Sequence, residues 1–122
     1  EFGSLHSFLH NEMVTVSQDI VQPILSDITS GMLFLISGSP PLFHRNLKAS
    51  NVLVSASLRA KLTDFGGICA DGPAGRRPPR NYWTAPECLR GGDVTEQSEV
   101  YSLGILLFEV LSRRDPYWGL DP

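Results

Sequence analysis

The sequence predicts an α+β fold in which helix predominates, and three observations support that prediction. Apolar residues recur at helical spacing through residues 17–36, which indicates a long helix with one buried face. Residues 98–112 are apolar on almost every side, so we expect a helix buried at the centre of the domain. Residues 51–54 and 60–63 are short β-type segments joined by a polar connection, which predicts a small hairpin.

Length and composition indicate one ordinary globular domain. The chain has 122 residues, 42% of them hydrophobic and 19% charged, which is enough for one core and too little for two. Its net charge of −3 gives no reason to expect nucleic-acid binding. Cys69 and Cys88 form neither a metal-binding nor a disulfide pattern, so a reducing compartment is the default expectation. We find no signal peptide and no apolar run long enough to span a bilayer, and we expect no membrane contact from this segment.

The predicted elements follow in order along the chain. Residues 3–10 favour a short helix after a Gly-Ser turn. In the helix over 17–36, Ser17 is a good N-cap, Pro23 weakens the first turns and Gly31 leaves room for close packing.

The regular pattern of apolar residues stops after the predicted hairpin and resumes near residue 85. Residues 66–81 are rich in Gly, Pro and Arg and lack periodicity, which predicts a loop. Residues 85–91 begin a short helix, and the apolar helix over 98–112 follows.

Three short motifs occur in one order: "HRNLKASN" at 44–51, "DFG" at 64–66 and "APE" at 85–87. Each alone is a weak signal, because such short runs also occur in ordinary turns. Their order and spacing, with a hairpin after the first and an apolar helix after the third, make a chance match very improbable. The sequence therefore resembles the first half of the C-terminal lobe of a eukaryotic-type protein kinase domain.

The resemblance covers almost the whole chain, from the hinge end at "EFGSL" to the central helix. It implies a protein-kinase-like fold in which residues 1–122 are a partial kinase domain: C-terminal-lobe helices plus a small β-hairpin at the catalytic loop. The N-terminal lobe, with its Gly-rich loop and Lys–Glu pair, and the last C-terminal-lobe helices are absent from this sequence. We therefore expect a fragment that, as a free-standing chain, exposes apolar surface and shows neither transfer nor nucleotide binding.

The resemblance also implies roles for individual residues around ATP and Mg²⁺, both of which would need the N-terminal lobe. Asp64 would hold Mg²⁺ and Asn51 would offer its amide oxygen to a second metal ion, because Mg²⁺ prefers oxygen ligands. Lys48 would lie beside the transferring phosphate as a cation. Three further residues would contact the nucleotide: Leu53 on adenine, Leu5 supporting the adenine pocket from below, and Ser4 at the ribose.

The chain departs from the family pattern at the position of the catalytic base. The family has Asp there, and this chain has Asn46, whose neutral amide accepts a hydrogen bond but takes no proton at any useful pH. General-base help is typically worth about 10²–10⁴ in rate, so we predict impaired transfer. The alternative is that Asn46 is a structural replacement in a protein that only binds nucleotide.

A second departure lies at the start of the central helix. The family usually has Asp there, hydrogen-bonded to the backbone of the catalytic loop, and this chain has Glu99. Because Glu is one methylene longer, we expect it to reach the loop and to hold it less rigidly.

The activation segment, residues 67–84, contains only two hydroxyl side chains, Tyr82 and Thr84, and both lie next to "APE". Since no mid-loop acceptor exists, we predict no activation by phosphorylation. The loop instead carries three arginines, which are either solvated or a docking patch for an acidic partner: Arg76, Arg77 and Arg80.

Two functions from different classes remain open. Lys48 is typical of serine/threonine kinases, whereas "YWTAPE" is similar to tyrosine kinases and to the kinase-homology domain of receptor guanylyl cyclases, and this mixture resembles the tyrosine-kinase-like group. The first function is a weakened kinase that transfers the ATP γ-phosphate to Ser, Thr or Tyr. The second is a pseudokinase that binds ATP or a partner to regulate a neighbouring domain, and a non-functional gene fragment is a third option.

We expect ATP and a protein substrate or regulated domain as partners, and a location in the cytoplasm or in the cytoplasmic part of a membrane protein.

Overall fold

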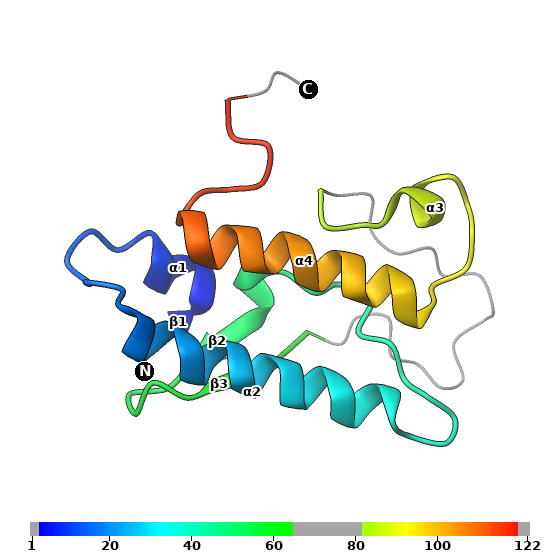
Figure 1. Ribbon diagram of the computed structural model, residues 1–122, viewed down its shortest axis with the longest axis horizontal. Helices are drawn as coiled ribbons and strands as arrows, with labels where there is room; N and C mark the ends of the chain where they lie inside the picture. The colour runs from blue at the N-terminus through cyan, green and yellow to red at the C-terminus, as the bar shows by residue number, and fades with distance from the viewer. Residues whose placement is uncertain (1–2, 65–81, 120–122) are drawn as a thin grey trace.

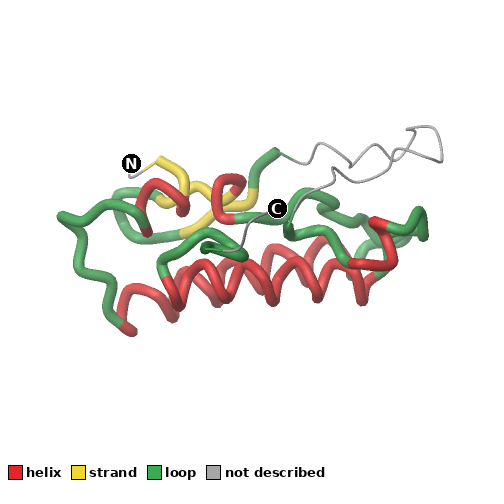
Figure 2. Tube along the Cα trace, turned by 90° about the horizontal axis from the view of Figure 1, so that it is seen from above, coloured by secondary structure: helices red, strands yellow, loops and turns green. Residues whose placement is uncertain are grey.

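The computed structural model describes residues 3–64 and 82–119, and these form two layers (Figure 1, Figure 2). The long helices α2 (Gln18–Ile36) and α4 (Glu96–Ser112) lie side by side in one layer. Helix α1 (Leu5–Leu9) and the strands form the other layer. The remaining elements are short: β1 (Gly3–Ser4), the 3-10 turn η1 (Ala49–Asn51), β2 (Val52–Val54), β3 (Ala60–Leu62) and α3 (Pro86–Leu89).

The strands form one antiparallel sheet in the order β1-β2-β3. The predicted hairpin is confirmed, with Val52 opposite Leu62 in the register of β2 and β3. The expectation of a simple Gly-Ser turn before α1 was wrong, because Gly3 and Ser4 pair with β2 as a third strand. Two residues carry no periodic signal of their own, and their partner strand lies far along the chain, so the sequence does not reveal this pairing.

Helix α2 covers the sheet with the stripe that its periodicity predicts. Ile24, Ile28 and Met32 are buried, and the helix packs mainly on β3. Gly31 is the point of close approach, since a Cβ atom there would lie 3.0 Å from the Leu62 side chain. Pro23 lies inside the helix, where it removes one backbone hydrogen bond, and the helix nevertheless continues through it.

Helix α2 also corrects the expectation about apolar runs. By length and composition alone it could cross a membrane, with a mean hydropathy of 1.3 over its most apolar window. Its polar face, however, is bonded to the hairpin: Arg59 donates two hydrogen bonds to the Asp27 carboxylate, at 2.8 and 2.7 Å, and the Ala60 N–H donates a third at 3.0 Å. These hydrogen bonds, together with its packing on β3, are the contacts of a helix that packs on the sheet of its own domain, although its length and composition alone would also fit a membrane-spanning helix.

Helix α4 begins two residues earlier than predicted, because Thr95 and Ser98 form a reciprocal capping box. The prediction that it is buried on every side was wrong for the described residues. Leu106 is fully buried, whereas Val100 and Leu111 are 60% and 74% exposed. The accompanying expectation of exposed apolar surface on this chain is thereby confirmed.

Candidate active site

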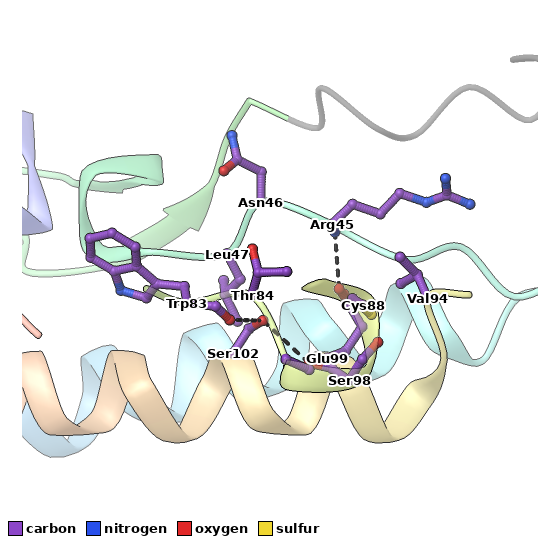
Figure 3. A pocket seen from close by; sticks show the side chains of 11 residues that line it. Arg45, Asn46, Leu47, Trp83, Thr84, Cys88, Val94, Ser98, Glu99 and Ser102 are labelled. Carbon is purple, nitrogen blue, oxygen red and sulfur yellow. Dashed lines mark hydrogen bonds between the residues drawn. The ribbon is translucent and has the colours of Figure 1, made fainter. Parts of the chain in front are cut away.

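The 44–51 loop connects the end of the α2 region to β2 and passes over α4 (Figure 3). Arg45 has a φ of 68°, a left-handed conformation that is uncommon for a residue with a side chain. Such conformations persist only where the surroundings fix them, and they cluster at functional sites. The contacts of this loop show what fixes it.

His44 is fully buried at the start of the loop and holds the backbone on two sides. Its Nε2–H donates to the Thr63 carbonyl at 3.1 Å, and its Nδ1 accepts from the Asn46 N–H at 3.2 Å. This pattern requires the neutral ring. Burial lowers the pKa of His44, which favours the same neutral form.

Glu99 holds the first end of the loop from α4. One carboxylate oxygen accepts the His44 N–H at 2.7 Å and the other accepts the Arg45 N–H at 3.0 Å. The side chain is 2% exposed, and burial raises the pKa of its carboxyl although the Arg45 and His44 bonds oppose the rise. The expected reach of the longer side chain is confirmed, and the less rigid hold stays a prediction.

Glu109 holds the other end of the loop, and the sequence analysis did not identify this role. A single carboxylate oxygen accepts the Ala49 N–H at 3.1 Å and the Trp83 Nε1–H at 2.7 Å. Burial raises the pKa of this carboxyl too, against the hydrogen bonds from Trp83 and Ala49. The available signal was an acid within the apolar run of α4, since a buried charge requires hydrogen-bond partners.

Asn46 lies between these two ends. The Asn51 Nδ2–H donates to the Asn46 carbonyl at 2.7 Å, so the backbone here is also fixed. The side-chain oxygen of Asn46 is buried and has no hydrogen-bond partner among residues 3–64 and 82–119. In Figure 3 the amide group points away from α4. The loop thus holds one buried acceptor, unpaired among the described residues, at the position of the predicted base.

The two predicted metal-binding residues lie at the same end of the hairpin. The Thr63 N–H donates to the Asn51 carbonyl at 2.9 Å, and Asp64 follows Thr63 in the chain. Asp64 is exposed and has a φ of 56°, a second left-handed residue at this site. A carboxylate and a primary amide oxygen are hard donors of the kind that Mg²⁺ prefers, and binding of Mg²⁺ by these two residues stays a prediction.

Lys48 and Trp83 link the loop to the segment before α3. The Lys48 ammonium group lies 5.6 Å from the centre of the Trp83 ring, within range of a cation–π interaction. Ser102 of α4 donates to the Trp83 carbonyl at 2.7 Å (Figure 3). Trp83 therefore contacts the loop through Lys48 and the helix through Ser102 and Glu109.

The three residues predicted to contact the nucleotide also lie together, around β1 and β2. Ser4 and Leu53 are opposite each other in the strand register. Leu53 is 46% exposed, whereas Leu5, the first residue of α1, is fully buried, so it could support a pocket only from within the core. The Ser4 hydroxyl accepts the Ser7 N–H at 3.1 Å as the N-cap of α1. The predicted loop over 66–81, with its three arginines, lies outside the described residues.

Comparison with known proteins agrees with these motifs. The family model for protein tyrosine and serine/threonine kinases matches residues 1–122. The chain belongs to the protein kinase family. It is 39% identical to the probable serine/threonine-protein kinase drkB and 36% identical to drkA, both of Dictyostelium discoideum, over 98% of its own length in each case. It is also 36% identical over 97% of its length to the calcium/calmodulin-regulated receptor-like kinase 1 of Arabidopsis thaliana.

The matched region is a small part of these relatives. The chain spans 18%, 19% and 28% of the lengths of drkB, drkA and the Arabidopsis kinase. The motif at 44–51 resembles the catalytic loop of protein kinases, and the 44–51 loop is called the catalytic loop below.

Proposed function

We propose that this chain is part of a kinase domain whose phosphate transfer is impaired by Asn46. The observation that carries the proposal is the contrast within the catalytic loop: its backbone is fixed by Glu99 and Glu109, yet the side chain at the base position is a neutral amide. The Asn46 oxygen is buried and unpaired among the described residues, and once uncovered it could orient an acceptor hydroxyl through a hydrogen bond. It could not accept the proton that the hydroxyl loses.

The other residues of the site support nucleotide chemistry in this proposal. Bound Mg²⁺–ATP would supply the phosphoryl group and neutralise its charge. Asp64 and Asn51 are the residues that would hold the metal ions, and Lys48 would add a positive charge beside the phosphate. Ser4, Leu5 and Leu53 would form the lower side of the nucleotide pocket. A protein chain that carries the N-terminal lobe would complete this pocket.

A kinase-family protein of this type acts on protein hydroxyl groups. The similarity to the probable serine/threonine-protein kinases drkB and drkA, together with Lys48, favours Ser or Thr as the acceptor over Tyr. The "YWTAPE" motif supports placement in the tyrosine-kinase-like group. The cytoplasm, or the cytoplasmic part of a membrane protein, is the proposed location.

The second candidate function is a pseudokinase that binds ATP or a partner and regulates a neighbouring domain, for example in a receptor guanylyl cyclase. The same residue, Asn46, favours it, because a binding role needs the loop scaffold and no base. An impaired kinase and an ATP-binding pseudokinase would both bind ATP, and they would differ in whether they transfer its γ-phosphate.

The experiment that tests the proposal measures both quantities in the longest protein that carries this segment. Mg²⁺–ATP affinity is measured by calorimetry, and transfer to a mixed Ser/Thr/Tyr peptide library by γ-phosphate label. An impaired kinase binds Mg²⁺–ATP and shows slow transfer that Asp64→Asn abolishes. Binding with no transfer above the Asp64→Asn control supports the pseudokinase, and transfer at the rate of an ordinary kinase contradicts the proposal.

A further inference from the structure

Two histidines and one aspartate meet where α1 contacts the segment after α4, away from the catalytic loop. The His6 Nε2 atom lies 3.0 Å from one oxygen of Asp115, and the His10 Nε2 atom lies 3.7 Å from the same oxygen. The two imidazole rings are tilted by 31° to each other, with centroids 4.3 Å apart. All three ligand-type atoms lie within 4.8 Å of one another. No role in phosphate transfer accounts for this group.

The spacing of the two histidines suits chelation by a helix. His6 and His10 are four residues apart, and the His10 N–H donates to the His6 carbonyl at 3.1 Å, so both rings project from one face of the same turn. Two histidines at this spacing on a helix form the zinc-binding half of other metal sites. Asp115 then supplies a third ligand from a distant part of the chain, 109 positions from His6.

The two His–Asp distances suit a tetrahedral ion. With zinc bonds of about 2.0–2.1 Å, two ligand atoms of a tetrahedral site lie about 3.3–3.4 Å apart. The two His–Asp separations, 3.0 and 3.7 Å, lie on either side of that value. A small rotation of the exposed rings would equalise them. Three protein ligands would leave the fourth position for water.

Arg113 fixes the backbone around this group. Its guanidinium donates to the carbonyls of Leu9 at 2.7 Å and Asn11 at 3.0 Å, one residue on either side of His10. Its own backbone has a φ of 57°, the left-handed conformation that ends α4 and turns the chain toward α1. The segment after α4 thus binds the backbone on both sides of His10 through Arg113, and it places the Asp115 carboxylate near the His10 ring. Figure 1 shows this end of α4 beside α1.

We propose that His6, His10 and Asp115 form a binding site for a divalent transition-metal ion of the zinc class. Two imidazoles and one carboxylate favour Zn²⁺ over Mg²⁺ or Ca²⁺, which prefer all-oxygen sites. The bound ion would join α1 to the segment after α4. Its consequence is structural: α1, whose inner side chains are part of the core, would be held more firmly against the domain.

Zinc titration of the full chain tests the proposal, with ZnCl₂ as the titrant, calorimetry as the readout and far-UV circular dichroism to confirm the fold. We expect one Zn²⁺ per chain, little competition from Mg²⁺, and a melting temperature that rises with Zn²⁺ concentration. His6→Ala, His10→Ala and Asp115→Asn should each weaken binding by at least about tenfold. Asp93→Asn, which removes an exposed carboxylate elsewhere, is the matched control and should bind as the native chain does.

Asp115 decides between a folded site and a simple histidine pair. Binding that is unchanged in Asp115→Asn would overturn the proposal, because the two histidines would then act without the folded arrangement. Absence of saturable Zn²⁺ binding by the native chain would also overturn it. Asp115→Glu, which keeps a carboxylate, should retain more affinity than Asp115→Asn and so distinguishes loss of a ligand from loss of structure.

Discussion

Glu99 and Glu109 lie on the same helix and hold opposite ends of the catalytic loop, but they use their oxygens differently. Glu99 accepts one backbone N–H on each oxygen. Glu109 accepts both of its hydrogen bonds, from Ala49 and Trp83, on one oxygen. Both side chains are 2% exposed, and burial raises the pKa of each carboxyl.

This difference shows what each end of the loop requires. The Glu99 end needs two acceptor atoms, which only a carboxylate provides, because an amide offers one oxygen and one N–H₂ group. The Glu109 end needs one acceptor atom, which an amide provides equally well. The two glutamates are equally buried, so the ends of the loop differ in how many carboxylate oxygens accept hydrogen bonds: two at Glu99 and one at Glu109.

The largest expected effect is at Glu99. Glu99→Gln places an N–H₂ group against a buried backbone N–H, and we expect a loss of about 2 kcal/mol in unfolding free energy. Glu99→Ala removes both acceptors and should cost about 3 kcal/mol. Urea unfolding of the full chain measures both values. A cost for Glu99→Gln no greater than that of Glu109→Gln would remove the distinction between the two ends.

A smaller effect is expected at Glu109. In Glu109→Gln the amide oxygen can accept from both Ala49 and Trp83, so the cost at neutral pH should be below about 1 kcal/mol. The pH dependence of the unfolding free energy also distinguishes the native chain from Glu109→Gln. Because the folded-state pKa of Glu109 is raised, the native chain loses stability relative to Glu109→Gln as pH rises from 4.5 through that pKa.

Unfolding measurements at several pH values between 4 and 8 check this sign. The quantity of interest is the difference between the native chain and Glu109→Gln, which cancels the titration of all other groups. A difference that stays constant across the range, or that moves in the native chain's favour with rising pH, would contradict the raised pKa.

The smallest effect is expected outside the loop, at Asp27. The hydrogen bonds from Arg59 hold the pKa of this carboxyl below its ordinary value of 3.8. The stabilisation is therefore present above that value and is lost as pH falls through the folded-state pKa, which is the opposite sign to Glu109. Asp27→Asn should lower the melting temperature slightly at pH 7, by less than Glu99→Gln does, and the difference should shrink in acid. Asp93→Asn is the control, with no change expected.

The sequence predicted the parts of the molecule that have a local signal. The periodicity of α2, the close approach at Gly31, the hairpin and the position of Asn46 could all be read from short runs of residues. The reach of Glu99 could be predicted because its place at the start of the apolar helix matches a family pattern.

The parts that the sequence did not reveal depend on contacts between distant residues. β1 pairs with a strand about fifty positions later, and its two residues have no periodicity of their own. The Trp83–Glu109 bond joins residues 26 positions apart, and the His6–Asp115 contact spans 109. An acid within the apolar run gave a signal that some partner existed, but not which one. The exposed face of α4 was expected as a consequence of a partial domain and is present in the structure.

The central claim is that the catalytic loop keeps its scaffold and lacks only its base. Single-turnover γ-phosphate transfer by the longest protein that carries this segment, compared with its Asn46→Asp variant, tests this claim most directly. We predict slow transfer by the native protein and a rise of about a hundredfold or more on substitution, within the range that a general base contributes. Clear transfer by the native protein that Asn46→Asp leaves almost unchanged would contradict the account.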